Sequence, residues 1–187
     1  RSTGGGNDEL IDLVWTHPTS IELLRTFPHV LIMDATYKTN RYKLPLFEIV
    51  GETSTGMTFM VAFAYLNFER NDNYHWVLSN LKTIMHDSHD IQPPKVVVTD
   101  REEALMKAIG DVWSDKITKN LLCRWHINNN ITRQCKGQFH SGEEWEEFIQ
   151  DWGVLVQAPT QAKYYDLLTT FETRYSYYSG AIEYVHR

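Results

Sequence analysis

Apolar runs that change their period along the chain predict an α/β protein. Residues 29–33 form a short continuous apolar run that ends at Asp34, which is typical of a strand buried on both faces. Two strand-like runs follow at 44–51 and 57–66, separated by a turn of hairpin length that contains Gly56. Three such runs in succession predict an antiparallel meander.

The next segments alternate between helical and strand periods. Apolar residues recur at helical spacing over 72–86, and the β-branched run that follows ends at Asp100. A second helix runs up to Gly110, and the pair is repeated as a strand over 117–123 and a helix over 125–135. The predicted order is therefore β-β-β-α-β-α-β-α, an α/β fold with a sheet of mixed direction.

Helical patterns are also predicted on both sides of this block. Residues 8–15 and 18–26 have the pattern of two short helices, and helical periodicity runs from Ser141 to about residue 178. Ser141 and Glu144 form a capping box, and Pro159 divides two helices. The expected parts are a linker or tag remnant at 1–7, a helical lead-in at 8–27, a core at 28–136 and a helical insertion or extension at 137–187.

Composition narrows the classes of function. The 187 residues, 42% of them hydrophobic, suffice for one domain or one domain with an appendage. A formal charge of -6 argues against a surface that binds nucleic acid mainly by neutralising phosphates, whereas acidic clusters that hold divalent cations fit it better. Two cysteines are too few for a disulfide framework, and no apolar run is long enough to span a bilayer, so we expect a soluble intracellular protein.

Asp34 and Asp100 each follow an apolar strand-like run. Ligand sites in α/β sheets gather outside strand ends, so these two carboxylates could converge there. Together they would hold Mg²⁺ or Mn²⁺, and a two-metal arrangement could activate water and stabilise the leaving oxygen of a cleaved phosphodiester. The alternative is that each Asp only caps the turn after its strand.

Four phrases, in this order, resemble the Mutator-like transposase family, often called MULE. They stand at Asp34–Leu46, Tyr74–Leu78, Val98–Glu102 and Cys123–Ile127. The resemblance implies an RNase H-like fold and a DDE mechanism, in which metal-bound water cleaves a DNA strand and the freed 3′-hydroxyl then attacks target DNA.

The resemblance also implies roles for single residues. Asp34 and Asp100 would be the first two metal ligands, and His126 would lie near the active centre as a proton shuttle, a phosphate contact or an orienter of the local fold. A buried His126 without catalytic duty is the alternative. The family places the third acid, a Glu, far downstream in an R-V-E-x-x-H phrase that does not occur in these 187 residues. We expect the chain to end within or just after the helical insertion, so neither Glu172 nor Glu183 is assigned.

Two other sets of residues are candidates for binding. Zinc accepts the side chains of Cys123, His126, Cys135 and His140, but their spacing departs from zinc-finger patterns, so structural zinc is disfavoured. Basic residues beside Asp34 are candidate DNA contacts, although a basic edge that discourages strand pairing is the alternative. These basic residues are Lys38, Arg41 and Lys43.

Other side chains near these phrases have two interpretations each. Glu102 suits the first turn of a helix and could also help at the metal site. Tyr37, Tyr42 and Trp125 could stack on bases, whereas the helical spacing around Trp76 favours a place in the core.

The leading interpretation is a partial DDE-type transposase catalytic domain in the nucleus. It would act on double-stranded DNA, at transposon ends and target sites, with Mg²⁺ or Mn²⁺, as a homo-oligomer in the full-length protein. The alternative is a domesticated, transposase-derived nuclear protein that binds DNA or other proteins and regulates transcription without cutting. A different RNase H-like nuclease fits the Asp34 and Cys123 phrases less well. Whether the chain is an active enzyme stays open, because no third acid is identifiable, and we expect weak DNA binding by this part alone.

Overall fold

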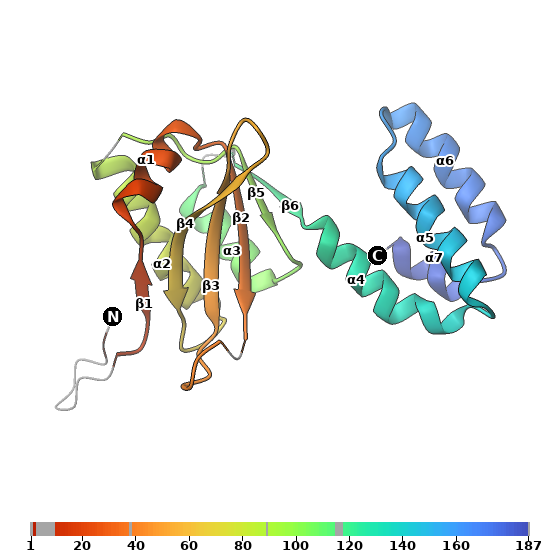
Figure 1. The fold of residues 1–187 in the computed structure, drawn as a ribbon, viewed down its shortest axis with the longest axis horizontal. Helices are drawn as coiled ribbons and strands as arrows, with labels where there is room; N and C mark the ends of the chain where they lie inside the picture. The colour runs from red at the N-terminus through yellow and green to blue at the C-terminus, as the bar shows by residue number, and fades with distance from the viewer. Residues whose placement is uncertain (1, 3–9, 38, 89, 115–117, 187) are drawn as a thin grey trace. The chain divides into compact units, whose positions relative to one another are not determined.

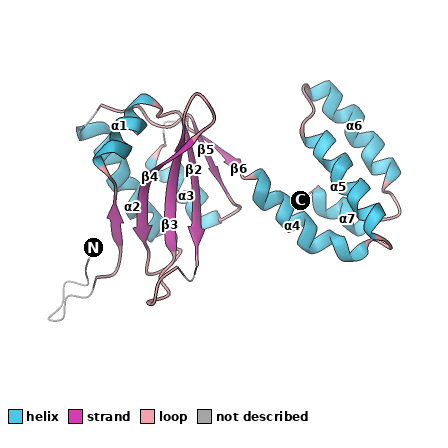
Figure 2. Ribbon diagram, viewed as in Figure 1, coloured by secondary structure: helices cyan, strands magenta, loops and turns pink. Residues whose placement is uncertain are grey.

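The chain folds into two units, residues 1–123 and residues 124–187 (Figure 1). The computed structural model describes residues 2, 10–37, 39–88, 90–114 and 118–186. Helices occur in both units, whereas all the named strands belong to unit 1 (Figure 2).

Unit 1 is built on a mixed sheet, which has six strands among the described residues, in the order β1-β4-β3-β2-β5-β6. Neighbours β2, β3 and β4 are antiparallel, whereas β5 runs parallel to β2 and β6 runs parallel to β5. The strands are β1 (Leu13–Trp15), β2 (Val30–Thr36), β3 (Leu46–Glu52), β4 (Thr58–Tyr65), β5 (Val96–Thr99) and β6 (Lys119–Leu122). The predicted meander and the predicted RNase H-like α/β class are therefore confirmed.

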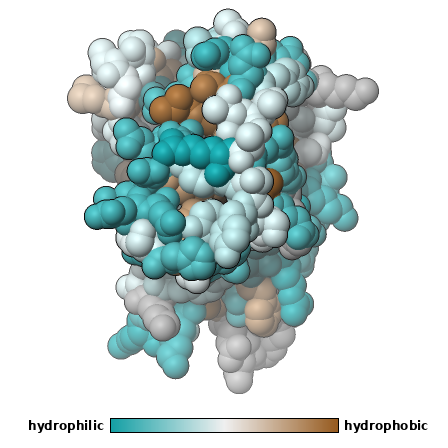
Figure 3. Space-filling view, turned by 90° about the vertical axis from the view of Figure 1, so that its right-hand side faces the viewer, coloured by the Kyte–Doolittle hydropathy of each residue, from teal (hydrophilic) through white to brown (hydrophobic). Residues whose placement is uncertain are grey.

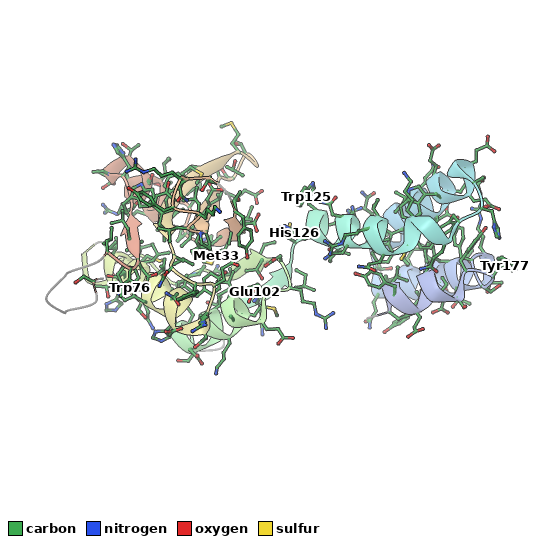
Figure 4. All side chains as sticks on the ribbon, turned by 90° about the horizontal axis from the view of Figure 1, so that it is seen from below. Met33, Trp76, Glu102, Trp125, His126 and Tyr177 are labelled. Carbon is green, nitrogen blue, oxygen red and sulfur yellow. The ribbon has the colours of Figure 1, made fainter. Side chains whose placement is uncertain are left out.

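Three helices complete the described part of unit 1: α1 (Pro18–Thr26), α2 (Asn71–Thr83) and α3 (Glu103–Val112). A π-helical turn, Ile84–Ser88, extends α2. Figure 4 shows α2 and α3 together on one side of the sheet. Alternate strand residues face this side, since Leu31 and Met33 are buried while Ile32 and Asp34 are only half-buried. Tyr74 and Leu105 bring the two helices into the same core.

Two of the predicted boundaries in unit 1 are wrong. Residues 13–15 do not form a helix but strand β1, because Leu13, Val14 and Trp15 pair with the last residues of β4 and extend the sheet by one strand. The helix α3 also does not end at Gly110. It continues to Val112, and this extra turn buries Val112 and Trp113 in the core.

Unit 2 is helical in its described part. It contains α4 (Arg124–Cys135), a 3₁₀ turn (Lys136–Gln138), α5 (Gly142–Val156), α6 (Gln161–Arg174) and α7 (Ser179–Val185). The capping box of Ser141 and Glu144 begins α5, and Pro159 lies between α5 and α6, both as predicted. Ile131 and Cys135 of α4 are buried in the core of unit 2, and the expected domain boundary after residue 136 stays a prediction.

One face of the molecule is largely polar. Figure 3 shows a predominantly hydrophilic face with small, separate apolar spots. Among the described residues, no helix is long and apolar enough to cross a membrane.

Candidate functional site

Parallel pairing of β2 with β5 brings Asp34 and Asp100 to neighbouring backbone positions. Val30 pairs with Val96, Leu31 with Val97 and Ile32 with Val98. The same offset places Asp34 beside Asp100, the residue that follows β5. Since adjacent strands lie about 4.8 Å apart and residues in register share a face, the two half-buried carboxylates start from neighbouring points on one side of the sheet. Their role as metal ligands stays a prediction.

Asp34 lies inside β2 and not at its end, because the strand continues to Thr36. Its carboxylate accepts a hydrogen bond from the backbone N–H of Ala35 (2.9 Å), and its backbone pairs with Glu48 of β3. A residue that is paired within a strand, and is followed by further residues of that strand, does not cap a turn. The turn-capping alternative therefore does not fit Asp34.

Two further acids accompany this pair. Glu102 is the N-cap residue of α3, and its Oε1 accepts a hydrogen bond from the Ala104 backbone N–H (3.2 Å). Glu69 lies just before Arg70, the N-cap residue of α2. Burial raises the pKa of Glu69 the most, and the nearby charges of Glu102, Asp100 and Asp34 raise it further. We call Asp34, Glu69, Asp100 and Glu102 the acidic cluster.

Sequence reasoning missed Glu69. It lies outside the four phrases that carry the family resemblance, and by pattern it only precedes a helix. The available signal was its place after a strand-like run, a position that it shares with Asp100. That signal becomes informative only when the strand order is known, because β4 is two strands away from β2 in the sheet.

Buried hydrogen bonds hold the segment that carries Glu69. The buried carboxylate of Asp12 accepts hydrogen bonds from the Asn67 backbone N–H and from Nδ2 of Asn73, both at 2.9 Å. The side chain of Asn71 donates to the carbonyl of Ala104 (3.3 Å), which joins the first turns of α2 and α3. The N-termini of both helices are therefore fixed beside the same edge of the sheet.

Tyr74 places a hydroxyl group beside Glu69. The residue is fully buried, and its ring packs edge-on against Phe47. Burial first, and then the charges of Glu69, Glu102 and Asp100, raise the pKa of Tyr74 above its usual range. The hydroxyl lies beside Glu69 and lowers the pKa of that carboxyl, but among the described residues it makes no hydrogen bond of regular geometry. It therefore stays protonated as a buried donor.

The donor chemistry of the acidic cluster fits a hard divalent cation, because Mg²⁺ and Mn²⁺ prefer carboxylate oxygens. No group of three or more ligating His, Cys, Asp or Glu side chains is already assembled among the described residues. Asp34 and Asp100 would therefore form the starting pair, and the remaining ligands would be water or a carboxylate that moves inward.

The loop between β2 and β3 carries the candidate DNA contacts. Asn40 shapes this loop, since its Oδ1 accepts from the backbone N–H groups of Tyr42 (3.0 Å) and Leu44 (3.2 Å). Arg41 and Lys43 are exposed, and the Arg41 guanidinium stacks on the Tyr42 ring at 4.7 Å. Lys38 lies outside the described residues. Because β2 and β3 are inner strands, protection of a sheet edge does not explain these basic residues.

The aromatic residues named above lie in two environments, the core and the surface. Trp76 packs against the core of unit 1, as predicted. Tyr37, Tyr42 and Trp125 are each at least 60% exposed. These three rings are therefore available to a partner.

His126 and Cys135 belong to unit 2. His126 lies in the first turn of α4, half-buried, with its ring edge-on to Trp125 at 4.8 Å, and its catalytic role stays a prediction. Cys135 is buried in the apolar core, and burial raises the pKa of its thiol. A neutral, buried thiol is a poor zinc ligand, since zinc binds the thiolate.

Comparisons with known proteins identify a family for most of unit 1. Residues 30–130, more than half of the chain, match the MULE transposase domain. The PKS-NRPS hybrid synthetase cheA of Chaetomium globosum is 28% identical over 127 residues, which are 68% of this chain and 3% of that protein. Protein FAR1-RELATED SEQUENCE 5 of Arabidopsis thaliana is 25% identical over 67% of this chain and 15% of its own length.

One further relative matches a longer part of the chain, and one solved structure is also similar to it. The putative protein FAR1-RELATED SEQUENCE 10 of Arabidopsis thaliana is 23% identical over 90% of this chain and 24% of its own length. The catalytic core domain of HTLV-2 integrase, solved in complex with magnesium, is 13% identical, with a TM-score of 0.35 over 58% of this chain and 70% of that domain. The chain thus spans at most about a quarter of the curated relatives named here.

Proposed function

We propose that this chain, which belongs to the MULE transposase domain family, is a partial DDE-type catalytic domain that binds Mg²⁺ or Mn²⁺ and cleaves and joins DNA strands. The observation that carries the proposal is the parallel pairing of β2 with β5, whose offset, continued by two residues, puts Asp34 level with Asp100 just after β5. Two carboxylates that start from neighbouring strands repel each other unless a cation lies between them. Metal binding would explain why the chain keeps two carboxylates that repel each other.

Each part of the chain would have a defined task in this reaction. Asp34 and Asp100 hold the cation, which when bound lowers the pKa of water and neutralises charge on the leaving oxygen. Arg41 and Lys43 contact phosphates and orient the duplex, together with Lys38. His126 moves a proton or contacts a phosphate. With a net charge of -6, the chain binds duplex DNA weakly and in a salt-dependent way, and other parts of the full-length nuclear protein recognise the transposon ends.

A second function is favoured by the relatives. Several of those that match are named FAR1-RELATED SEQUENCE, and one is named FAR-RED IMPAIRED RESPONSE 1, which are not names of enzymes. In that case the same fold serves a domesticated nuclear protein that binds DNA or other proteins and regulates transcription without cutting. Both functions retain the fold, so only chemistry distinguishes them.

Isothermal titration calorimetry with Mn²⁺ tests the proposed metal site. We expect the Asp34→Ala and Asp100→Ala variants to bind Mn²⁺ at least about tenfold more weakly than the wild-type chain, because the charge of the ligand set determines affinity. The control is Asp72→Asn, which removes an exposed carboxylate from the first turn of α2. Equal affinity in wild type and Asp34→Ala would show that the assignment is wrong.

Nicking of supercoiled plasmid DNA separates the two functions. Nicking that requires Mn²⁺ and disappears in Asp34→Ala would support the transposase chemistry. Intact plasmid at every Mn²⁺ concentration, with Mn²⁺ still bound, would support the regulatory alternative.

A further inference from the structure

We propose that the face of the sheet that carries Asp34 also carries a stacking platform for the bases of a single DNA strand. The platform consists of three aromatic rings, those of Trp15 in β1 and of Phe63 and Tyr65 in β4. The inference rests on the proposed function for its choice of DNA, and it adds the form of DNA that the chain binds near its pair of acids.

Strand register places the platform level with Asp34. One row of directly paired residues crosses β2, β3, β4 and β1, and its members share a face of the sheet because paired residues point to the same side. The row consists of Asp34, Glu48, Phe63 and Trp15. At about 4.8 Å between adjacent strands, its two ends lie about 14 Å apart. A few nucleotides of one DNA strand, at about 3.4 Å each, span that distance.

Alternation along the strands turns the three rings away from the core. In β4, Ala62 and Ala64 are buried in the core of unit 1, whereas Phe63 and Tyr65 are only half-buried. In β1, Trp15 is 39% exposed. The rings therefore lie at the surface, on the side of the sheet that does not face α2 and α3.

The rings are arranged to receive a flat partner. Trp15 stacks on Phe63, with ring centroids 5.4 Å apart and ring planes at 17°, and it also contacts the ring of Tyr65 at 5.3 Å. The strand of Trp15 is an edge strand of the described sheet. Cross-strand contacts explain how the rings stabilise β1, but they leave much of the indole exposed. A base can stack on such a ring, because every base has a flat π-face.

A basic loop borders the platform. Tyr65 lines a cavity of about 300 Å³ together with Arg41 and Tyr42 from the loop between β2 and β3. The Arg41 guanidinium lies over the Tyr42 ring, which is 66% exposed, and Lys43 in the same loop is also exposed. Flat rings beside cations match the chemistry of a DNA strand, whose bases stack and whose phosphates are negative.

The chemistry favours unpaired bases over a duplex. In a duplex the faces of the bases are stacked on one another, so a base reaches an aromatic side chain only when it leaves the stack or belongs to a single strand. The net charge of -6 also limits the attraction of the whole chain for phosphates. Stacking on the platform would therefore supply most of the affinity for a single strand.

Fluorescence anisotropy with a labelled oligothymidylate, measured on the whole chain without divalent cations, tests the inference. We expect the oligothymidylate to bind more tightly than a duplex of the same length, and Trp15→Ala to weaken its binding at least about tenfold. Trp15→Phe keeps a ring in the row and should lose less. The control is Tyr177→Ala, which removes a ring that is 78% exposed in unit 2 and should bind as wild type does.

Two further variants decide the matter if Trp15→Ala destabilises β1. Tyr42→Ala and Arg41→Ala each remove an exposed side chain beside the cavity, so both should keep the thermal midpoint of the wild type. We expect each to weaken oligothymidylate binding about fivefold. Arg41→Ala should also make the binding less dependent on salt, because it removes a phosphate contact.

The outcomes separate this inference from the proposed function. If Trp15→Ala and Tyr42→Ala bind the oligothymidylate like the wild type, or if the duplex binds as tightly as the single strand, the platform does not exist. The metal site is judged by a different measurement, since the oligothymidylate is bound without divalent cations. Equal Mn²⁺ affinity in wild type and Asp34→Ala would overturn the proposed function, whatever the oligothymidylate does.

Discussion

The two units use acids at helix N-termini in opposite ways. In unit 2, Glu144 accepts hydrogen bonds from the backbone N–H groups of His140 (3.1 Å) and Ser141 (3.2 Å), and a hydrogen bond with Tyr178 is the largest cause of its lowered pKa. In unit 1, burial and the charges of nearby carboxylates raise the pKa of Glu69. The same residue type thus stabilises one unit and destabilises the other.

The two units also differ in whether basic side chains accompany their acids. In unit 2, Arg174 forms ion pairs with Asp151 (2.6 Å) and Glu147, and Tyr175 also donates to Asp151 (2.9 Å). In the acidic cluster of unit 1, carboxylates act on one another instead. Acids whose pKa is perturbed, but which gain no stabilising hydrogen bond or ion pair, are characteristic of functional sites, although structural networks also perturb pKa values. This difference is why we place the chemistry in unit 1 and assign the acids of unit 2 to stability.

The strongest test of this division is to remove the core of unit 2. Phe148 is fully buried, and its ring contacts the rings of Phe139, Trp145, Phe171 and Tyr175. We expect Phe148→Ala to lower the free energy of unfolding of unit 2 by about 4 kcal/mol, because a large buried ring leaves a cavity. Differential scanning calorimetry should show an early transition for unit 2, while Mn²⁺ binding by unit 1 is unchanged.

A matched control lies on the same helix. Val154→Ala removes apolar atoms from a residue that is 50% exposed, so it should leave both transitions in place. If Phe148→Ala abolished Mn²⁺ binding together with the early transition, the two units could not be assigned separate roles.

The next prediction tests whether the hydrogen bonds of Asp12 hold the acidic cluster of unit 1 in place. Asp12→Ala leaves the Asn67 N–H group and the Asn73 amide without their buried acceptor, which costs about 2 to 3 kcal/mol of the free energy of unfolding. Because these bonds hold the segment before α2 at the edge of the sheet that carries Asp34 and Asp100, we expect Mn²⁺ affinity to fall as well. Urea denaturation and Mn²⁺ calorimetry measure the two effects.

Asp12→Asn is the control for this prediction, since it keeps one oxygen acceptor and should lose less stability. An Asp12→Ala variant that unfolds earlier but binds Mn²⁺ as wild type does would mean that this segment does not influence the cation site of Asp34 and Asp100.

Elements with a strong periodic pattern could be predicted from the sequence, whereas a short strand at the edge of the sheet could not. The strands β2 to β5 and the capping box at Ser141 follow from local pattern alone. The strand β1 does not, because three residues such as Leu13, Val14 and Trp15 become a strand only when β4 offers them a partner.

The candidate site shows the same limit. Asp34 and Asp100 could be predicted because each follows an apolar run, and the resemblance reinforced both residues. Glu69 could not, since its proximity depends on the pairing of β2, β3 and β4 and on the bonds of Asp12 with a segment more than fifty residues away. Such non-local contacts have no signature in a local window of sequence.

The smallest predicted effect sharpens the contrast between the acids. Because the pKa of Glu144 is lowered below its ordinary value of 4.5, this acid stabilises folded unit 2 above that pH, and its contribution is lost as the pH falls through the lowered value. Glu144→Gln should therefore lower the thermal midpoint of unit 2 at about pH 7, and its difference from wild type should shrink as the pH falls below the ordinary value of 4.5. Glu143→Gln, which removes an exposed charge one residue earlier but leaves the bonds to His140 and Ser141, is the control. Wild type and Glu144→Gln curves that remained parallel down to the lowest pH would mean that the carboxylate of Glu144 stabilises no more than an amide does, and the two units would then differ in the crowding of their acids alone.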